Sequence, residues 1–202
     1  MVINQSERMA KGYAFTSMEG AVIVLRDAQK TAKEGGYGEV WKDATIVTVP
    51  MDIAVRLALQ KRDRYSERGQ TTLASILNII PTNENRDEAI QINKGAFQDQ
   101  GKTPLFYIDS DDAVGTTTMP MYFNRQMLVQ EWTAQNPGQA LPPVKALELT
   151  YILEAALRGY ANKLPNNGNV SFVADPEQVN IAKQLRSKGL DLTMYKMDQM
   201  IV

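Results

Sequence analysis

The sequence predicts an α+β fold in which one module of short strands covered by helices occurs twice, as a pseudo-twofold pair. Runs rich in Val, Ile and Thr alternate along the 202 residues with segments whose apolar residues recur at helical spacing. Residues 20–92 also align with residues 119–185 through their apolar positions, although few residues are identical. A repeat of this length is too long for a solenoid unit and indicates two packed copies of a small module.

Two offsets describe the repeat. A shift of 98 residues brings Leu25 onto Phe123 and residues 51–59 onto residues 149–157. The shift falls to 93 in the last third of each copy. From this register we predict that Leu25 and Phe123 occupy equivalent environments in the two copies.

The first half, residues 20–108, follows a polar N-terminal arm at residues 1–19. Strands are expected where β-branched residues cluster, at 20–25, 44–50 and 73–80. Helices are expected where apolar and charged residues alternate at helical spacing, at 26–34, 51–64 and 84–94. The first helix is predicted to stop at Gly35 and Gly36. A charged stretch follows the second helix as far as Gly69.

A central strand is expected between the copies, at residues 103–108, followed by an acidic turn. The second half, residues 109–202, repeats the plan, with strands expected at 119–123, 144–149, 170–174 and 192–202. Helices are expected at 124–134, 150–160 and 175–188. Asn124 and Asp175 are good N-caps, and Pro176 suits a first helical turn. We expect the two halves to pack as one domain, with helices laid over sheets.

The composition excludes most catalytic chemistry. The chain has no cysteine and no histidine, so it lacks the groups that most nucleophiles, general bases and transition-metal sites require. We therefore expect no enzyme activity, no cofactor and no metal site. The 22 basic and 23 acidic residues give a net charge of −1, which indicates no nucleic-acid partner. No apolar run approaches the roughly 20 residues of a transmembrane segment.

Three polar motifs each have a simple structural explanation. Asp109, Asp111 and Asp112 follow a strand, but the calcium-loop glycine and closing glutamate are missing, which favours a solvated turn. The Gly-Gly-Tyr-Gly segment at 35–38 lacks the residues of a phosphate loop and is interpreted as a helix stop. The basic run at 61–68 could contact phosphate or an acidic partner, but a solvated helix end is the simpler interpretation.

Methionine and aromatic residues provide the stronger functional signal. Methionine adapts its shape and is overused on surfaces that bind varied apolar partners. Two clusters of such residues are therefore candidates for binding a protein partner: Met119, Met121, Tyr122, Phe123, Met127 and Trp132 in one strand and helix, and Met194, Tyr195, Met197 and Met200 in the tail. The alternative is that these side chains fill the core. The tail favours binding, because a chain terminus rarely lies wholly inside a core.

The order of the elements resembles that of Tic22-like proteins. The resemblance rests on the sequence of five segments rather than on any single motif: residues 22–29, TIVTVP at 45–50, PLFYI at 104–108, MPMYF at 119–123 and FVADPEQV at 172–179. It spans most of the chain and includes the internal duplication. The charged insert at 61–69 is unlike the shorter loop of the family.

The resemblance implies a pseudo-twofold α+β fold with apolar patches, found in plastids and cyanobacteria, that acts on proteins as a soluble chaperone or adaptor in translocation. A second hypothesis is an accessory, linker-type structural subunit, soluble or peripherally attached, that stabilises a large photosynthetic assembly such as a red-algal phycobilisome antenna. A carboxylate-dependent enzyme is a remote third hypothesis. A stoichiometric, salt-resistant complex on purification would favour the second over the first.

Overall fold

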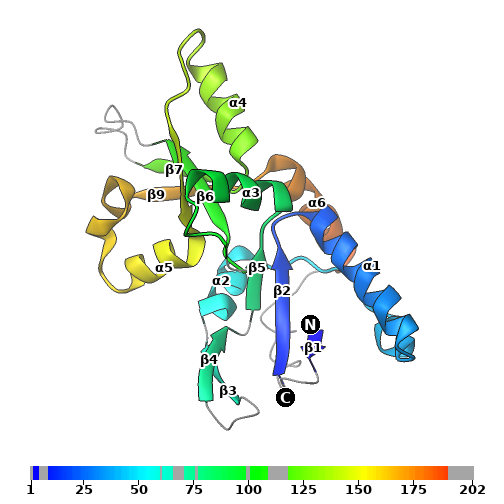
Figure 1. Cartoon of the computed structure of the whole chain (residues 1–202). Helices are drawn as coiled ribbons and strands as arrows, with labels where there is room; N and C mark the ends of the chain where they lie inside the picture. The colour runs from blue at the N-terminus through cyan, green and yellow to red at the C-terminus, as the bar shows by residue number, and fades with distance from the viewer. Residues whose placement is uncertain are drawn as a thin grey trace. The chain divides into compact units, whose positions relative to one another are not determined.

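The computed structural model of the chain (Figure 1) describes residues 2–4, 9–59, 61–65, 71–75, 77–98, 101–108 and 118–190. Its internal contacts divide the chain into two compact units. One unit comprises residues 78–176, and the other comprises residues 1–77 together with 177–202. These boundaries differ from those of the predicted halves, 20–108 and 109–202. Strands and helices alternate along the chain, which confirms the predicted α+β class.

A four-stranded mixed sheet forms the centre of the unit at residues 78–176. The strand order is β8 (Val144–Glu148), β6 (Pro104–Ile108), β7 (Met119–Tyr122) and β9 (Val170–Val173). β6 is antiparallel to both β8 and β7, whereas β9 is parallel to β7. Phe106 lies opposite Ala146 on one side and Tyr122 on the other. These three side chains therefore point to the same face of the sheet.

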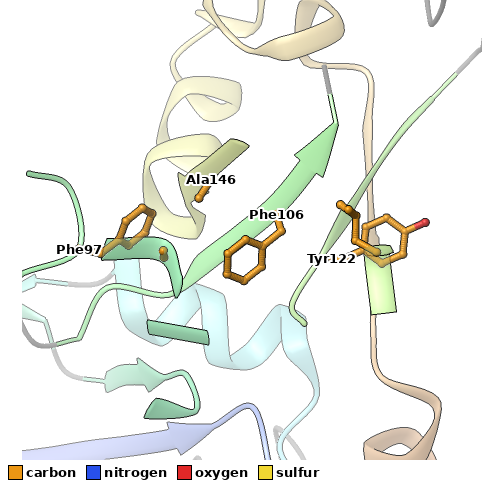
Figure 2. Close-up of a cluster of buried hydrophobic side chains, with 6 residues drawn as sticks. Phe97, Phe106, Tyr122 and Ala146 are labelled. Carbon is orange, nitrogen blue, oxygen red and sulfur yellow. The ribbon is translucent and has the colours of Figure 1, made fainter. Parts of the chain in front are cut away.

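Two helices pack their apolar residues on that face. Ala89 of α3 (Asn83–Ile92) and Leu128 of α4 (Arg125–Gln135) join the three strand residues and Phe97 in one buried cluster (Figure 2). Phe97 and Phe106 are completely buried. Leu105 of β6 and Met121 of β7, on the opposite face of the sheet, are also completely buried, so the two central strands have buried side chains on both faces.

The helices of this unit begin at residues whose side chains accept backbone hydrogen bonds. Thr82 caps α3, Asn124 caps α4, and Glu148 caps α5 (Leu149–Leu157). Such caps satisfy N–H groups that have no partner in the first helical turn. The buried hydroxyl of Thr103 donates to the backbone carbonyl of Ile79 at 2.7 Å. Two 3₁₀ turns, Ala161–Lys163 and Pro165–Gly168, connect α5 to β9.

The other unit contains three α-helices, α1 (Met18–Glu34), α2 (Met51–Leu59) and α6 (Pro176–Ser187), and a 3₁₀ turn at Gly38–Trp41. Its strands form two antiparallel pairs, β1 (Val2–Asn4) with β2 (Met9–Phe15) and β3 (Lys61–Tyr65) with β4 (Thr71–Ser75). The strand β5 (Leu77–Ile80) spans the boundary between the units.

Two hydrogen bonds join segments of this unit that are distant in sequence. The backbone N–H of Met18 donates to the side-chain oxygen of Gln178 at 2.8 Å, which connects the start of α1 to α6. The backbone N–H of Thr48 donates to the carbonyl of Leu190 at 2.9 Å. The first and last parts of the chain therefore belong to one unit through specific polar contacts.

Three predictions about the first half are wrong. Residues 20–25 belong to α1 rather than to a strand, because Ser17 caps a helix that continues through the apolar run. Residues 44–50 contain only an isolated bridge, at Thr48. The helix predicted at 51–64 ends at Leu59, and the charged residues that follow pair with β4 in a hairpin. Because Leu25 lies in α1 whereas Phe123 directly follows β7, their predicted equivalence is also wrong.

The predictions for the second half are confirmed to within a few residues, apart from 192–202, which lies outside the described residues. The strands β6 to β9 and the helices α4 to α6 form where the β-branched and periodic segments indicated. In the first half, α3 forms as expected, and α1 stops at Gly35, with Gly36 at a left-handed φ of 78°. Within the described ranges, no helix combines the length and apolarity needed to cross a membrane.

Candidate protein-binding surfaces

Four of the residues predicted to contact a partner lie in or directly after β7 and are buried. Met119, Met121, Tyr122 and Phe123 are each at most 9% exposed. Figure 2 shows the ring of Tyr122 within the same cluster as Phe106. A partner has no access to these side chains in this structure, so the prediction of a binding surface is corrected here to core filling. Successive side chains of a strand point to opposite faces of the sheet. Because both faces of β7 carry buried side chains, apolar residues follow one another along this segment without interruption.

The hydroxyl of Tyr122 has a polar partner on α4. Burial, together with a hydrogen bond to the carboxylate of Glu131 on α4, raises the pKa of Tyr122 to about 12. The hydroxyl donates and the carboxylate accepts, so α4 is linked to β7 by more than apolar contact. Directly after the same strand, the ring of Phe123 lies 6.3 Å from that of Phe172 on β9, measured between centroids.

The two candidate residues on α4 are half-buried. Met127 packs against the buried cluster. The indole nitrogen of Trp132 is buried and has no hydrogen-bond partner within the described part of the chain. The four tail candidates lie outside the described residues: Met194, Tyr195, Met197 and Met200. Of the predicted contact residues that the structure describes, none lies on an exposed surface.

Exposed apolar side chains occur instead on and after α5. Leu157, at the C-terminal end of this helix, is 76% exposed, the largest value among the exposed apolar residues described. The rings of Tyr151 on α5 and Tyr160 just after it are each about half exposed. The opposite side of the helix buries Leu149, Ile152 and Ala155. We call Tyr151, Leu157 and Tyr160 the α5 surface.

Charged residues accompany the α5 surface without covering it. Arg158 lies 3.7 Å from Glu154, one turn earlier on the helix, and both side chains are largely or partly exposed. The ammonium group of Lys163 lies 4.9 Å from the centroid of the Tyr160 ring, within the range of a cation–π contact. Exposed pairs of this kind contribute little to stability, and Leu157 and both tyrosines keep at least about half of their surface exposed beside them.

The sequence contained a signal for this surface that was missed. The nine residues of α5, LTYILEAAL, are apolar almost all round the helix. A helix that is apolar on every side is expected to be buried on every side. Because α5 buries only one side, Tyr151, Ala156 and Leu157 are exposed. A search for helices with excess apolar residues would have selected this segment.

Exposed apolar residues of the other unit are distributed over several elements. Ile23 and Val24 on α1 are half exposed, and the others are Tyr13, Tyr37, Val47, Met51 and Val179. Single exposed apolar residues are normal on protein surfaces. Only the adjacent pair on α1 compares with the α5 surface.

A polar contact network joins α3 to α4. The guanidinium group of Arg125 lies 3.2 Å from the carboxylate of Glu88, and the backbone N–H of Arg125 donates to the side-chain oxygen of buried Asn85 at 3.3 Å. Gln126 donates to the carboxylate of Glu84 at 2.7 Å. These contacts hold α4 against α3, and we interpret the network as structural.

The described ranges contain no group of three or more acidic residues placed to hold a metal ion. The acidic turn with Asp109, Asp111 and Asp112 lies outside them. The basic run at 61–68 is also described only in part, with Lys61–Tyr65 in β3.

The arrangement of these elements defines an α+β protein in which strand–helix units recur along the chain. Among solved structures, the chain is similar to Anabaena Tic22, a protein of protein transport, with a TM-score of 0.53. The match covers 92% of this chain and 85% of that chain at 16% sequence identity. This similarity supports the Tic22-like fold that the sequence predicted, and at this identity it shows the fold alone. No protein-family model and no curated protein matches the sequence.

Proposed function

We propose that this chain is a non-catalytic protein-binding module that acts in protein transport, as a chaperone or adaptor, in a plastid or a cyanobacterial cell. The similarity of its fold to that of Anabaena Tic22 supports this proposal. The lack of histidine and cysteine in the sequence is in keeping with work that needs no catalytic group, cofactor or metal. The observation that carries the proposal is the α5 surface, in which Leu157 is 76% exposed and Tyr151 and Tyr160 are each about half exposed.

The size of this surface favours reversible binding. Burying one large apolar side chain contributes about 1.5–3 kcal/mol. Three such side chains would contribute about 4.5–9 kcal/mol, which is similar to the free energy that association costs, about 4–15 kcal/mol. The α5 surface alone therefore suits transient contact with exposed apolar segments of a client protein.

A permanent structural role would use the same surface differently. A linker-type subunit of a photosynthetic assembly, such as a phycobilisome antenna, would bury the α5 surface in a stoichiometric complex that resists salt. A chaperone or adaptor would leave the surface exposed on purification. We favour the transient role, since the solved structure to which the fold is similar, Anabaena Tic22, is of a protein of protein transport.

The test compares two substitutions of exposed leucines in the same unit. Leu157→Ser removes the most exposed apolar group of the α5 surface, and Leu141→Ser, at a residue that is 37% exposed, is the matched control. The measurement is suppression of aggregation of a heat-unfolded test enzyme by the purified chain. Losing one such contact should weaken client binding by about tenfold. The control should retain the suppression.

Both variants should keep the unfolding free energy of the parent to within about 0.5 kcal/mol, as surface substitutions usually do. Equal suppression by Leu157→Ser and the parent chain would contradict the assignment of the α5 surface. Failure of the parent chain itself to suppress aggregation would contradict the chaperone role.

A further inference from the structure

The strand β9 forms one edge of the four-stranded sheet. The strand order places β8 at the other edge and β6 and β7 between them. Among the described residues, β9 pairs with β7 alone. An edge strand has one row of backbone groups directed away from the sheet, and these groups form a template for another strand.

The register of the parallel pair identifies those groups. The N–H of Met119 donates to the carbonyl of Asn169 at 2.9 Å, and the N–H of Phe123 donates to the carbonyl of Val173 at 3.4 Å. In a parallel ladder, alternate residues of a strand direct both backbone groups toward the same neighbour. Ser171 therefore faces β7, whereas Val170 and Phe172 direct their N–H and C=O groups to the outer side.

The two edges of the sheet differ in their protection. Edge strands commonly carry lysine or proline, which disfavour the addition of another strand. β8 has the exposed side chain of Lys145 and directly follows Pro142 and Pro143. β9 has the sequence Val-Ser-Phe-Val, with no charge and no proline. Of these two edges, only that of β9 lacks a protecting residue.

The side chain of Phe172 adds an apolar contact beside the outer edge. It is 39% exposed, and its other side lies against Phe123. Val170 points to the same face of the sheet as Phe172, because side chains alternate along a strand. An added strand would place every second side chain beside these two residues, and those side chains should be apolar.

We propose that the outer edge of β9 binds an extended, uncharged segment of a partner protein as an additional strand. This inference rests on the proposed protein-binding function but assigns a second site, away from the α5 surface. Backbone hydrogen bonds would provide affinity for extended chain of many sequences, and Phe172 would select apolar residues at alternate positions. Such a site suits a client that is unfolded during transport.

A partner segment fits this edge better than β9 of a second copy. The residues before β9 turn sharply, with positive φ at Asn166, Asn167 and Gly168. After β9, the chain enters α6 at Pro176. A second β9 is therefore limited to four residues and would bring its own turn and helix start against the edge. An extended segment has no such limit at its ends.

The first test uses peptides and leaves the chain unchanged. The probe is a fluorescent peptide of alternating valine and threonine, whose valines should lie beside Phe172. For a peptide that adds antiparallel to β9, the orientation we expect, N-methylation of the valines removes the N–H groups directed at β9, whereas N-methylation of the threonines removes those directed away. In a parallel addition the two sets exchange, and the larger effect falls on the threonines. We expect valine methylation to weaken binding, measured by fluorescence anisotropy, by about tenfold for each lost hydrogen bond. Threonine methylation should change binding by less than about threefold.

A second test compares Phe172→Pro with Phe172→Ala. Both variants lose the ring and leave the ladder with β7 intact. Only proline also removes the N–H that residue 172 directs to the outer side. Phe172→Pro should bind the unmodified peptide about tenfold more weakly than Phe172→Ala. Near-ultraviolet circular dichroism monitors folding, and if Phe172→Pro is unfolded, the methylated peptides decide the question.

Three results would overturn the inference: no binding of the unmodified peptide, equal effects of the two methylation patterns, or self-association of the chain that Phe172→Pro abolishes. The last result would assign the edge to a second copy. Aggregation suppression that depends on Leu157 but not on Phe172 would refute this inference and leave the proposed function standing.

Discussion

The elements of the first part of the chain recur in the second, and the two series differ mainly in the segments between elements. α2 (Met51–Leu59) and α5 (Leu149–Leu157) have the same length and lie 98 residues apart. β5 (Leu77–Ile80) and β9 (Val170–Val173) also have the same length and lie 93 residues apart. The connection from α2 to β5 has 17 residues and that from α5 to β9 has 12. This difference of five residues accounts for the change in offset.

The earlier elements follow a different offset. β2 ends at Phe15 and α1 begins at Met18, whereas β7 ends at Tyr122 and α4 begins at Arg125, a shift of 107 residues. The sequence alignment had extended the shift of 98 into this region and therefore paired a helical residue with one that follows a strand. The comparison teaches that the order of these elements is retained where connection lengths are not. Their lengths also vary, since α1 has 17 residues and α4 has 11.

Substitutions at equivalent positions of α2 and α5 should have the largest effect. Ile152 of α5 is 1% exposed, and its equivalent at a shift of 98 is Ala54 of α2, also buried. Ile152→Ala should lower the unfolding free energy by about 2–5 kcal/mol. Ala54→Ile should lower it by about 1–3 kcal/mol through overpacking. Urea unfolding measures both changes.

The control for this pair is Tyr151→Ala, because Tyr151 is about half exposed on the same helix. It should change the unfolding free energy by less than about 0.5 kcal/mol. A neutral Ile152→Ala would show that α5 is not anchored through this side chain.

At high pH, stability should fall through the ionisation of a residue on β7 that has no titratable equivalent on β2. At a shift of 107, Tyr122 corresponds to Phe15, which has no hydroxyl. Because burial and Glu131 raise the pKa of Tyr122 from 10.0 to about 12, the folded state retains a proton that the unfolded state loses. This contribution to stability is complete below pH 10 and disappears as the pH rises through about 12.

The measurement is urea unfolding across this pH range, together with phenolate absorbance. Tyr122→Phe should remove this part of the pH dependence, and Glu131→Gln should lower the pKa of Tyr122. A phenolate titration of Tyr122 at its ordinary pKa in the folded protein would contradict the hydrogen bond to Glu131 and the burial of the Tyr122 ring.

The two equivalent helix caps, Asn124 and Ser17, should differ in strength. The side chain of Asn124 accepts from the N–H groups of Gln126 and Met127, at 2.8 and 3.3 Å. Ser17 accepts from Gly20 alone, at 3.2 Å. Asn124→Ala should lower the unfolding free energy by about 1–2 kcal/mol, and Ser17→Ala by about 0.5–1 kcal/mol. A larger loss at Ser17 would reverse this ranking.

The smallest effect is expected at the exposed ion pair of α5. Arg158 and Glu154 have no equivalent pair in α2, where the corresponding residues are Gln60 and Arg56. Arg158→Ala should lower the unfolding free energy by no more than about 0.5 kcal/mol. A double-mutant cycle with Glu154→Ala at low and high salt checks this value, and a coupling well above it would indicate a less solvated pair.

Much of the second half could be predicted because its local signals agree. Asn124 and Pro176 mark helix starts, and uninterrupted apolar runs mark strands that are covered on both faces. The first half was harder because its signals conflict. The run Ala-Val-Ile-Val-Leu has strand propensity, but the cap at Ser17 and the periodic residues after the run place it in α1.

The binding site was the weakest sequence prediction, because it depends on which groups cover an apolar side chain. Residue type indicates that Met121 and Phe123 avoid water, but it does not indicate whether their own core or a partner covers them. That choice depends on which strands are neighbours and which helices pack on them. A local sequence does not contain this information.

The sequence by itself determined the class of fold, the recurrence of its elements, the caps and turns, and the lack of imidazole and thiolate chemistry. Each of these follows from residue type and from neighbours within a few positions. Only the tertiary structure decided that β7 is buried, that α5 exposes Leu157, and that β9 is an edge without lysine or proline. Burial and edge position depend on contacts between residues far apart in sequence.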